Sequence, residues 1–352
     1  MYCDWFFLSF HYKVIGMSKK VVAAVDIGYG NTKYVVPGDS GELRCELFPS
    51  VAVLDNTVRN HTDDFSARQN ITLVTVNGAQ YKVGPDAVLS VSPHDTGRVL
   101  TNEYSTTDRY MALYLGALSN IGRKTIDLLV TGLPVQHYRS KSMREQLEGR
   151  LSEEHPYPNG DRITVKKAKV VSQPLGGFAH YALSGKNYTE LKDSFSIVCD
   201  VGFFTVDWIC VKGFQIIDER SGSVAMGVSQ LLNALAQEIA VDCGEPFGDI
   251  NRLDDSMRNG YKFSRYGMEY SYKHLLPKVM PKLDHACEAL AASVGTMDDI
   301  GSVILVGGGA KYYVNSIRRV CKKNAIVTAD DALYANVRGF YGIGLKSASA
   351  QG

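Results

Sequence analysis

The chain has 352 residues, of which 45% are hydrophobic and 21% are charged. These values are typical of a folded globular protein, and they exclude intrinsic disorder, collagen and coiled coil as descriptions of the whole chain. Lys and Arg number 38 against 37 Asp and Glu, so no overall positive charge points to direct binding of nucleic acid. The length predicts two domains or one large domain.

The first 16 residues combine several aromatic side chains with Asp4 and His11. Their apolar run is far shorter than the roughly 20 residues that span a membrane, and it lacks the basic start and cleavage site of a secretory signal. We therefore expect residues 1–16 to be a non-native or disordered extension outside the fold, with Met17 as the natural start. The alternative is a short anchor at a membrane interface. No other segment is expected to cross a membrane.

Apolar runs separated by turn-forming residues predict an alternation of strands and helices along the rest of the chain. Strands are expected at 21–25, 32–36, 73–76, 80–83, 127–134, 196–202, 205–211 and 302–306. Helices are expected at 105–118, 141–151, 176–183, 227–239 and 283–294, and from 310 onward. This pattern predicts the α/β fold class.

The segment from Ser196 to Gly202 repeats the one from Ala23 to Gly28, with Asp200 standing 174 positions after Asp26. In both copies a strand ends in an aspartate and a glycine-containing turn, and a second strand follows at once. A repeat of one strand–turn–strand unit at this distance predicts two similar domains built from a duplicated module.

The seven cysteines follow no C-x-x-C pattern. A chain of this size needs no disulfide bonds, so we expect reduced thiols and a cytoplasmic location. The eight histidines form no H-x-x-x-H or H-E-x-x-H pair, which gives a zinc site no support.

The first repeat carries the sequence Asp26-Ile27-Gly28-Tyr29-Gly30-Asn31-Thr32-Lys33. An aspartate at the end of a buried strand is well placed to face a cleft, and glycines two residues apart let backbone amides approach a phosphate. Lys33 adds a positive charge. The alternative is an ordinary hairpin turn, in which Asp and Gly are common.

The second repeat, from Asp200 through Gly202 and Phe203 to Thr205, favours the phosphate interpretation. Two such turns facing each other across a cleft would bind a polyphosphate from both sides. Their paired carboxylates suit a hydrated Mg²⁺ ion, which needs few protein ligands. Gly307-Gly308-Gly309, between a strand and a helix, is a third place where backbone could approach a nucleotide.

Gln173 stands in a polar turn that we expect just before the helix at 176–183. A glutamine cannot act as a strong base, but it can orient a water molecule for in-line attack on a γ-phosphate. The alternative is that Gln173 is a plain turn or cap residue.

In this order along the chain, these motifs resemble those of the actin-like ATPase superfamily, and within it most of all those of the bacterial ParM/StbA plasmid-segregation actins. The narrower likeness is carried by 26–33, 131–135 (Thr-Gly-Leu-Pro-Val), 226–229 (Met-Gly-Val-Ser) and 337–341 (Val-Arg-Gly-Phe-Tyr). The resemblance implies an actin-like fold of two related, ribonuclease H-like domains around a nucleotide cleft. It places domain I at 17–190, completed by 333–352, and domain II at 191–332.

The resemblance also implies roles for individual residues. Asp26 and Asp200 would hold Mg²⁺ through water, and Gln173 would position the attacking water. The residues implied to bind the nucleotide are Gly28, Tyr29, Gly30, Asn31, Lys33, Gly202, Phe203, Thr205, Gly227, Gly307, Gly308 and Gly309. One departure is Phe203, because the second phosphate turn of the family usually has glycine there.

By this resemblance we expect a cytoplasmic ATPase, with ATP or GTP as substrate, that polymerises into dynamic filaments when nucleotide binds. The filament would segregate plasmid DNA through a DNA-binding adaptor of the ParR type, without binding nucleic acid or membrane itself. The alternative is a non-polymerising ATPase or a small-molecule kinase of the same superfamily. A kinase would need a carboxylate base such as Asp207, but the sequence contains no sugar-site motif.

Overall fold

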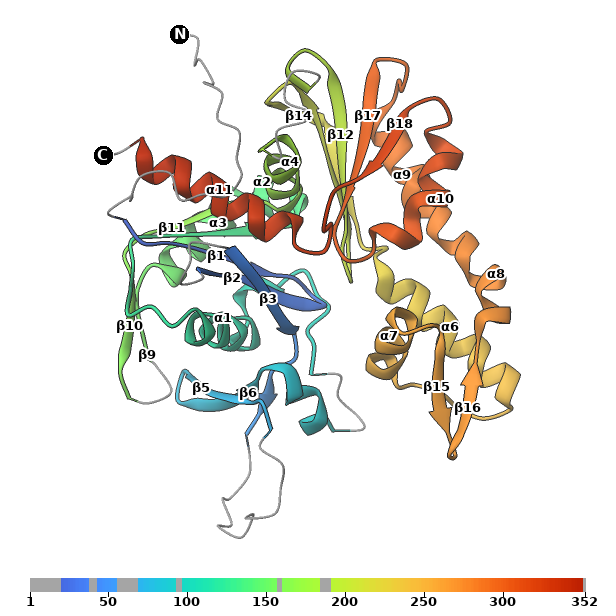
Figure 1. The fold of residues 1–352 in the computed structure, drawn as a ribbon, viewed down its shortest axis with the longest axis horizontal. Coiled ribbons are helices and arrows are strands. Elements are labelled where there is room, and N and C mark those ends of the chain that lie inside the picture. The colour runs from blue at the N-terminus through green and yellow to red at the C-terminus, as the bar shows by residue number, and fades with distance from the viewer. Residues whose placement is uncertain are drawn as a thin grey trace.

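The computed structural model describes residues 20–37, 43–55, 69–92, 97–156, 160–183 and 191–350. The expected extension at 1–16 lies outside these residues. Two five-stranded sheets lie side by side and are flanked by helices (Figure 1). Within the described residues, no helix has the length and apolar character needed to cross a membrane.

The first sheet has the strand order β11-β8-β1-β2-β3. Strand β1 runs antiparallel to β2 and parallel to β8, which is in turn parallel to β11. The strands are β1 (Val22–Ile27), β2 (Asn31–Pro37), β3 (Leu43–Pro49), β8 (Leu128–Leu133) and β11 (Ala168–Ser172).

The second sheet, of order β14-β13-β12-β17-β18, repeats this topology. Strand β12 is antiparallel to β13 and parallel to β17, and β17 is parallel to β18. The register repeats as well, because Asp26 pairs with Lys33 in one hairpin and Asp200 with Asp207 in the other. The strands are β12 (Phe195–Val201), β13 (Val206–Lys212), β14 (Gln215–Val224), β17 (Ile300–Val306) and β18 (Ala325–Thr328).

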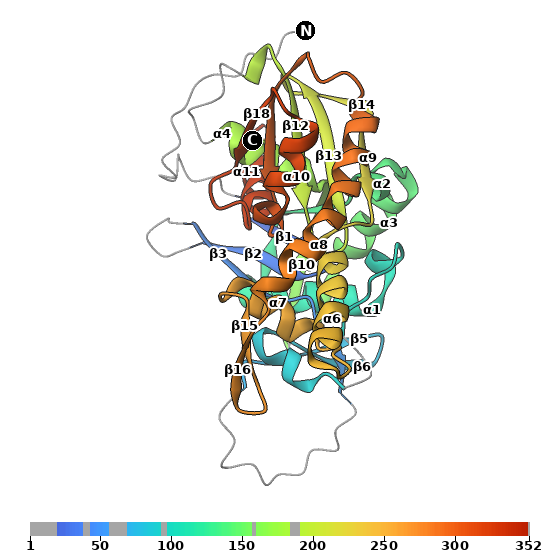
Figure 2. The same cartoon turned by 90° about the vertical axis from the view of Figure 1, so that its right-hand side faces the viewer.

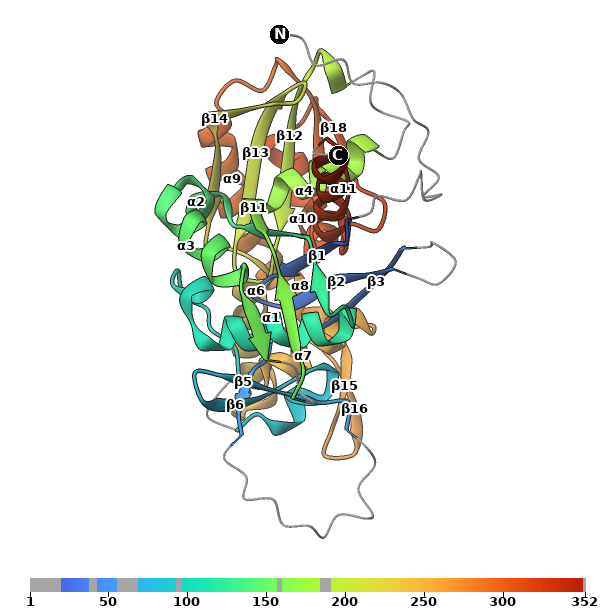
Figure 3. The ribbon, with the colours of Figure 1, turned by 90° about the vertical axis from the view of Figure 1, so that its left-hand side faces the viewer.

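Helices cover both faces of each sheet (Figures 1 and 3). On β1, Ala23 and Val25 join the core under α1 (Asp108–Ile121), whereas Ala24 joins the core under α11 (Ala335–Ser349). Side chains alternate between the faces of a strand, so a strand covered on both faces is apolar throughout. The second sheet has α9 (Asp284–Val294) and α10 (Ala310–Val320) on one face and α4 (Gln173–Leu183) on the other.

Smaller elements extend from the two sheets (Figures 1 and 2). On the side of the first sheet are β4 (Val53–Leu54), β5 (Thr72–Val76), β6 (Ala79–Val83), η1 (Pro85–Ser90), η2 (Tyr104–Thr106), β7 (Thr125–Ile126), α2 (Val135–Arg139), α3 (Lys141–Leu151), β9 (Glu154–Pro156) and β10 (Arg162–Val165). On the side of the second are α6 (Val228–Cys243), α7 (Ile250–Arg258), β15 (Lys262–Arg265), β16 (Met268–Ser271), η3 (Lys273–Leu275), α8 (Leu276–Val279) and η4 (Met280–Leu283).

Two helix starts differ from the prediction by three residues. The helix expected from Ser105 begins at Asp108, because Ser105 lies in the preceding 3₁₀ turn and Thr107 caps α1 by accepting a hydrogen bond from the Tyr110 amide. The helix expected from Gly176 begins three residues earlier, at Gln173. Proline fits the first turn of a helix, so Pro174 continues α4 instead of delaying its start. Gln173 is therefore a helical residue and not a turn residue.

Helix α11 crosses α4 where the two sheets meet, and glycines make this crossing possible. A Cβ atom at Gly339 would overlap the backbone of Gly176, and one at Gly176 would overlap Phe340. The backbones can approach this closely only without side chains. The crossing gives a physical reason for the Val-Arg-Gly-Phe-Tyr motif, and it fixes the first residues of both helices near each other.

We expect Gly339→Ala to destabilise the protein by about 3 kcal/mol, because overpacking a closely packed contact costs roughly this much. The matched control is Gly149→Ala in α3, where a Cβ would meet no atom within 4 Å. This control should raise stability by about 0.5–1 kcal/mol, since alanine favours the helix. Thermal unfolding measures both. A Gly339→Ala protein as stable as the Gly149→Ala protein would contradict the role of the crossing.

One helix from each half of the chain packs on the sheet of the other half. Helix α4 follows β11 of the first sheet but packs on the second, and α11 follows the second sheet but packs on β1 and β8 of the first. We propose domain I as 17–190 completed by 333–352 and domain II as 191–332, with α4 as the helix through which domain I contacts domain II.

Candidate functional site

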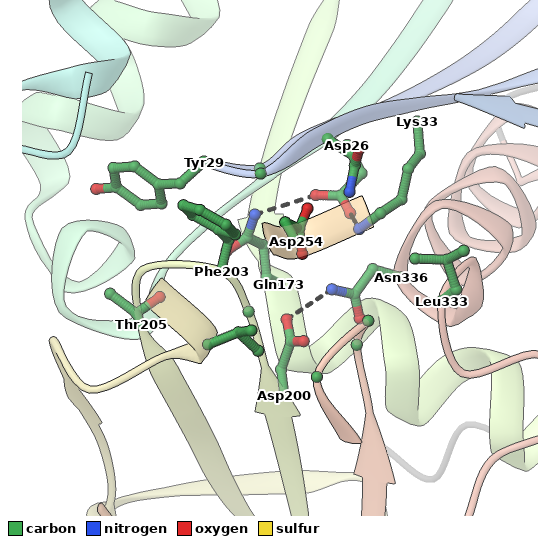
Figure 4. A pocket seen from close by; sticks show the side chains of 18 of the residues that line it. Asp26, Tyr29, Lys33, Gln173, Asp200, Phe203, Thr205, Asp254, Leu333 and Asn336 are labelled. Atoms are coloured by element: carbon green, nitrogen blue, oxygen red, sulfur yellow. Dashed lines mark hydrogen bonds and ion pairs between the residues drawn. The ribbon is translucent and has the colours of Figure 1, made fainter. Parts of the chain in front are cut away.

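A pocket lies where β1 and β12 end, between the two sheets. Figure 4 shows Asp26 and Asp200 on opposite sides of it, at the ends of the two equivalent strands. All the predicted site residues except Gly227 line the pocket: Asp26, Gly28, Tyr29, Gly30, Asn31, Lys33, Gln173, Asp200, Gly202, Phe203, Thr205, Gly307, Gly308 and Gly309.

The first turn, Gly28–Gly30, has its carbonyl groups bound by the protein. The Ser50 hydroxyl donates to Gly28 O at 2.5 Å, and the Ser50 amide donates to Gly30 O at 2.9 Å. The Arg98 guanidinium donates to the carbonyls of Tyr29 and Gly30. With its carbonyls held in this way, the turn is fixed in one orientation.

The second turn, Gly202–Thr205, is held by the start of α6. The amides of Gly227, Val228 and Ser229 donate to the carbonyls of Phe204, Gly202 and Phe203 at 2.9, 3.1 and 2.7 Å, respectively. The carbonyls of this turn therefore point toward α6. The Met-Gly-Val-Ser motif at 226–229 thus has a structural role, because its backbone amides hold the second turn in place.

Within the described residues, the backbone amides of Tyr29, Gly30 and Phe203 donate to no protein acceptor. Backbone amides without an internal partner, grouped around a concave surface, form a binding site for anions. The two turns therefore combine bound carbonyls with available amides at one pocket, which is the arrangement that a phosphate chain requires.

Asp26 is buried and lies at the centre of a polar group on the first sheet. Its carboxylate accepts from Lys33 Nζ at 2.9 Å and from Gln173 Nε2 at 3.0 Å (Figure 4). Burial lowers the pKa of Lys33, but the attraction and hydrogen bond of Asp26 outweigh this effect, so the pKa lies above its usual value. Lys33 is therefore charged at neutral pH and neutralises Asp26.

Asp200 is the corresponding carboxylate on the second sheet, but its hydrogen-bond partner is a neutral amide and not a lysine. Asn336 Nδ2 donates to Asp200 Oδ2 at 2.6 Å (Figure 4). Burial raises the pKa of Asp200 to about 7, and repulsion from Asp26 adds to this effect, while Lys33 and Asn336 act against it. Ionising Asp200 therefore costs free energy in the folded protein when no cation lies beside it.

This donor set fits a hydrated magnesium ion. Mg²⁺ usually keeps several waters and binds one or two carboxylates together with substrate phosphates. The described residues contain no cluster of three or more His, Cys, Asp or Glu side chains suited to a metal, so an ion beside Asp200 would take most of its ligands from water and phosphate. A nearby cation would also offset the cost of ionising Asp200.

Gly307–Gly309 form the third wall of the pocket, directly before α10. Gly307 has a φ of 88°, and a Cβ there would overlap Asp200 Oδ1. A Cβ at Gly309 would come within 2.5 Å of both Val201 and Val228. These glycines let the backbone before α10 lie against Asp200 and the end of β12.

Gly227 does not line the pocket, unlike the other residues predicted to bind nucleotide. It lies behind the second turn, where a Cβ would come within 2.7 Å of the carbonyl oxygens of Gly202 and Phe203. Gly227 therefore has a structural role: its lack of a side chain lets α6 approach the turn, and it does not face the pocket.

Several residues that line the pocket were not predicted from the sequence. Asp254 and Arg258, which form an ion pair of 2.8 Å, come from α7. Asn336 precedes a recognised motif by one residue, and this position was the one available signal for it. The missed residues are Val228, Asp254, Arg258, Tyr312, Leu333 and Asn336.

Two family models match the chain in succession. The model of the N-terminal domain of actin-like proteins matches residues 24–176, and the model of the C-terminal domain of the archaeal actin homologue MreB-like proteins matches residues 198–318. The chain belongs to the actin-like ATPase superfamily. No curated protein matches it in sequence.

Solved structures of actin-like proteins have the same fold. The archaeal actin homologue Ta0583 has a TM-score of 0.74 at 18% identity, and its complex with ADP has 0.70 at 16% identity. A ParM filament from Clostridium botulinum has 0.73 at 19% identity. In each case the match covers 93% of this chain and 99% of the other. The predicted two-domain actin-like fold is confirmed.

Proposed function

We propose that the chain hydrolyses ATP or GTP with Mg²⁺ and polymerises into filaments when nucleotide binds. The observation that carries this proposal is the pair of equivalent turns, which direct backbone amides and two carboxylates into one pocket. The binding of ADP by an archaeal actin homologue of the same fold supports a nucleotide as the ligand.

In this proposal the amides of the two turns and Lys33 bind the phosphates, and Asp26 and Asp200 hold the magnesium ion through water. The ion would neutralise negative charge on the phosphates. Gln173, hydrogen-bonded to Asp26, orients the attacking water. Asp254, Arg258 and Tyr312 line the pocket from α7 and α10, on the side of domain II, and we assign the nucleoside to that side.

Filament formation is supported by the family and by solved filaments of the same fold, among them the ParM filament from Clostridium botulinum. We further propose that the filament segregates plasmid DNA through an adaptor of the ParR type. The formal net charge of +1 supports an indirect link, because proteins that bind DNA directly commonly carry a basic surface. The six cysteines that the structure describes are free, which supports a cytoplasmic location.

A small-molecule kinase would need a carboxylate that accepts a proton from the substrate hydroxyl. Asp207, the candidate from the sequence, is buried, and its Oδ1 accepts from the Val135 amide at 2.7 Å. It is not among the described residues that line the pocket. The geometry therefore favours water over a second substrate as the phosphoryl acceptor.

High-speed pelleting tests the proposed function. We expect the full chain to pellet with Mg·ATP or Mg·GTP, to stay in the supernatant without nucleotide, and to release inorganic phosphate as filaments form. A chain that binds and hydrolyses nucleotide but stays in the supernatant at high concentration would contradict polymerisation alone. A chain that binds no nucleotide would contradict the whole proposal.

A further inference from the structure

The second turn carries two consecutive phenylalanines, and both contact the opposite domain. Phe203 and Phe204 follow β12, yet both pack against the hydrophobic core of the first sheet. Phe203 also packs against the core of the second sheet. The turn is therefore attached to both domains directly beside the pocket.

Phe204 contacts the first turn through an aromatic ring. The ring centroids of Phe204 and Tyr29 are 4.8 Å apart, and Tyr29 stacks on Tyr104 at 4.7 Å. Tyr29 and Tyr104 belong to the first sheet's core, and the Tyr29 hydroxyl donates to Thr101 O. The first turn therefore presents a rigid aromatic surface to Phe204.

Phe203 contacts the same turn through its side chain. A Cβ at Gly30 would come within 2.7 Å of Phe203 Cβ, so the two turns touch at this point. The Arg98 guanidinium lies 4.9 Å from the centre of the Phe203 ring, where a cation–π contact is favourable. Figure 4 shows Phe203 beside Tyr29 at the pocket.

Arg98 connects three segments at this place. It donates to the carbonyls of Tyr29 and Gly30 on the first turn and, through Nε, to Asn251 of α7 at 3.1 Å. The same guanidinium stacks on Phe203 of the second turn. Moving the two turns apart would therefore break the aromatic contacts and the Arg98 contacts together.

We propose that Phe203 and Phe204, with Tyr29 and Arg98, form an aromatic clamp that holds the two turns together and sets how fast a bound nucleotide is released. This inference rests on the proposed nucleotide binding. A nucleotide held between the turns leaves when they separate, and the clamp opposes that separation.

The first test measures release of a fluorescent mant-ADP from the full chain by stopped flow. The main variant is Phe204→Gly, because Phe204 is not among the described residues that line the pocket and its loss leaves the direct nucleotide contacts in place. We expect release about tenfold faster than from the unchanged protein, the factor that corresponds to 1.4 kcal/mol. Phe203→Gly should have an effect at least as large.

The matched control is Phe214→Gly. Phe214 also packs between the domains, with its ring centroid 5.7 Å from that of Phe178 in α4, but it does not line the pocket in the described residues. We expect release from this variant to stay within about twofold of the unchanged rate. Release from Phe204→Gly that is no faster than release from Phe214→Gly would overturn the proposal.

A second measurement needs no nucleotide. Hydrogen exchange of the amides in 26–33 should be faster in the nucleotide-free Phe204→Gly protein than in the unchanged protein or the Phe214→Gly protein. If no protein binds mant-ADP or mant-GDP, the proposed function fails, and hydrogen exchange still tests the clamp. If Phe204→Gly does not fold, Phe204→Leu keeps apolar volume without the ring contact and decides the question. Unchanged exchange would overturn the clamp.

Discussion

Replacing Asp200 with asparagine should lower nucleotide hydrolysis by about 100- to 1000-fold, while the nucleotide-free protein becomes more stable at pH 8. Asp200 is one of the two carboxylates that we assign to the magnesium ion, and losing one preorganised electrostatic contact at a reacting phosphate costs roughly this factor. Asparagine has nearly the same shape and can still accept the hydrogen bond from Asn336. The variant therefore removes charge with little change in packing.

The gain in stability follows from the direction of the pKa shift. Burial raises the pKa of Asp200 from 3.8 to about 7, so the folded protein binds this proton more tightly than the unfolded chain does. The unchanged protein then loses stability as pH rises from about 4 to 7, and the full cost remains above 7. At about 1.4 kcal/mol per pKa unit, this cost is on the order of 4 kcal/mol at pH 8.

Thermal unfolding at pH 5 and pH 8 checks this expectation. Asp200→Asn should unfold at a higher temperature than the unchanged protein at pH 8, and the difference should shrink at pH 5. Asp218→Asn, which neutralises an exposed carboxylate of the same sheet, is the matched control and should change neither stability nor hydrolysis. Full hydrolytic activity of Asp200→Asn would contradict the proposed role of Asp200 in holding the magnesium ion.

The repeated strand–turn–strand unit was predictable because both copies follow a simple physical rule. Strands covered on both faces are mostly apolar, as β1 and β12 are, and in each the next-to-last residue is a buried aspartate. The same register places Asp26 and Asp200 at equivalent positions. The repeat thus predicted two similar domains with their carboxylates at equivalent strand ends.

Helix α7 was not predictable in the same way. Its apolar residues Ile250, Leu253 and Met257 recur at helical spacing, but over only nine residues this periodicity does not say which neighbour the helix packs against. Asp254 and Arg258 line the pocket only because α7 packs beside α6. Asn336 faces Asp200 because of the crossing of α4 and α11. Both positions depend on packing between segments far apart in the sequence, which local patterns do not encode.

Gln173→Ala should slow hydrolysis by about 100-fold while nucleotide affinity changes by only a few fold. In our proposal Gln173 orients the attacking water and does not hold the phosphates, and misplacing a reacting group by about 1 Å costs roughly this factor. The side chain is buried at the start of α4, and its hydrogen bond to Asp26 Oδ1 fixes where it lies. Single-turnover phosphate release, measured beside equilibrium binding, separates the two effects.

The neighbouring Ser172→Ala variant is the matched control for Gln173→Ala. The Ser172 hydroxyl is buried, and among the described residues it has no hydrogen-bond partner, so removing it should leave hydrolysis unchanged and stability the same or higher. If Gln173 acts on water, Gln173→Ala filaments should also form with ATP and persist longer, because the nucleotide stays uncleaved. Equal losses of affinity and of the rate of phosphate release would instead assign Gln173 to nucleotide binding.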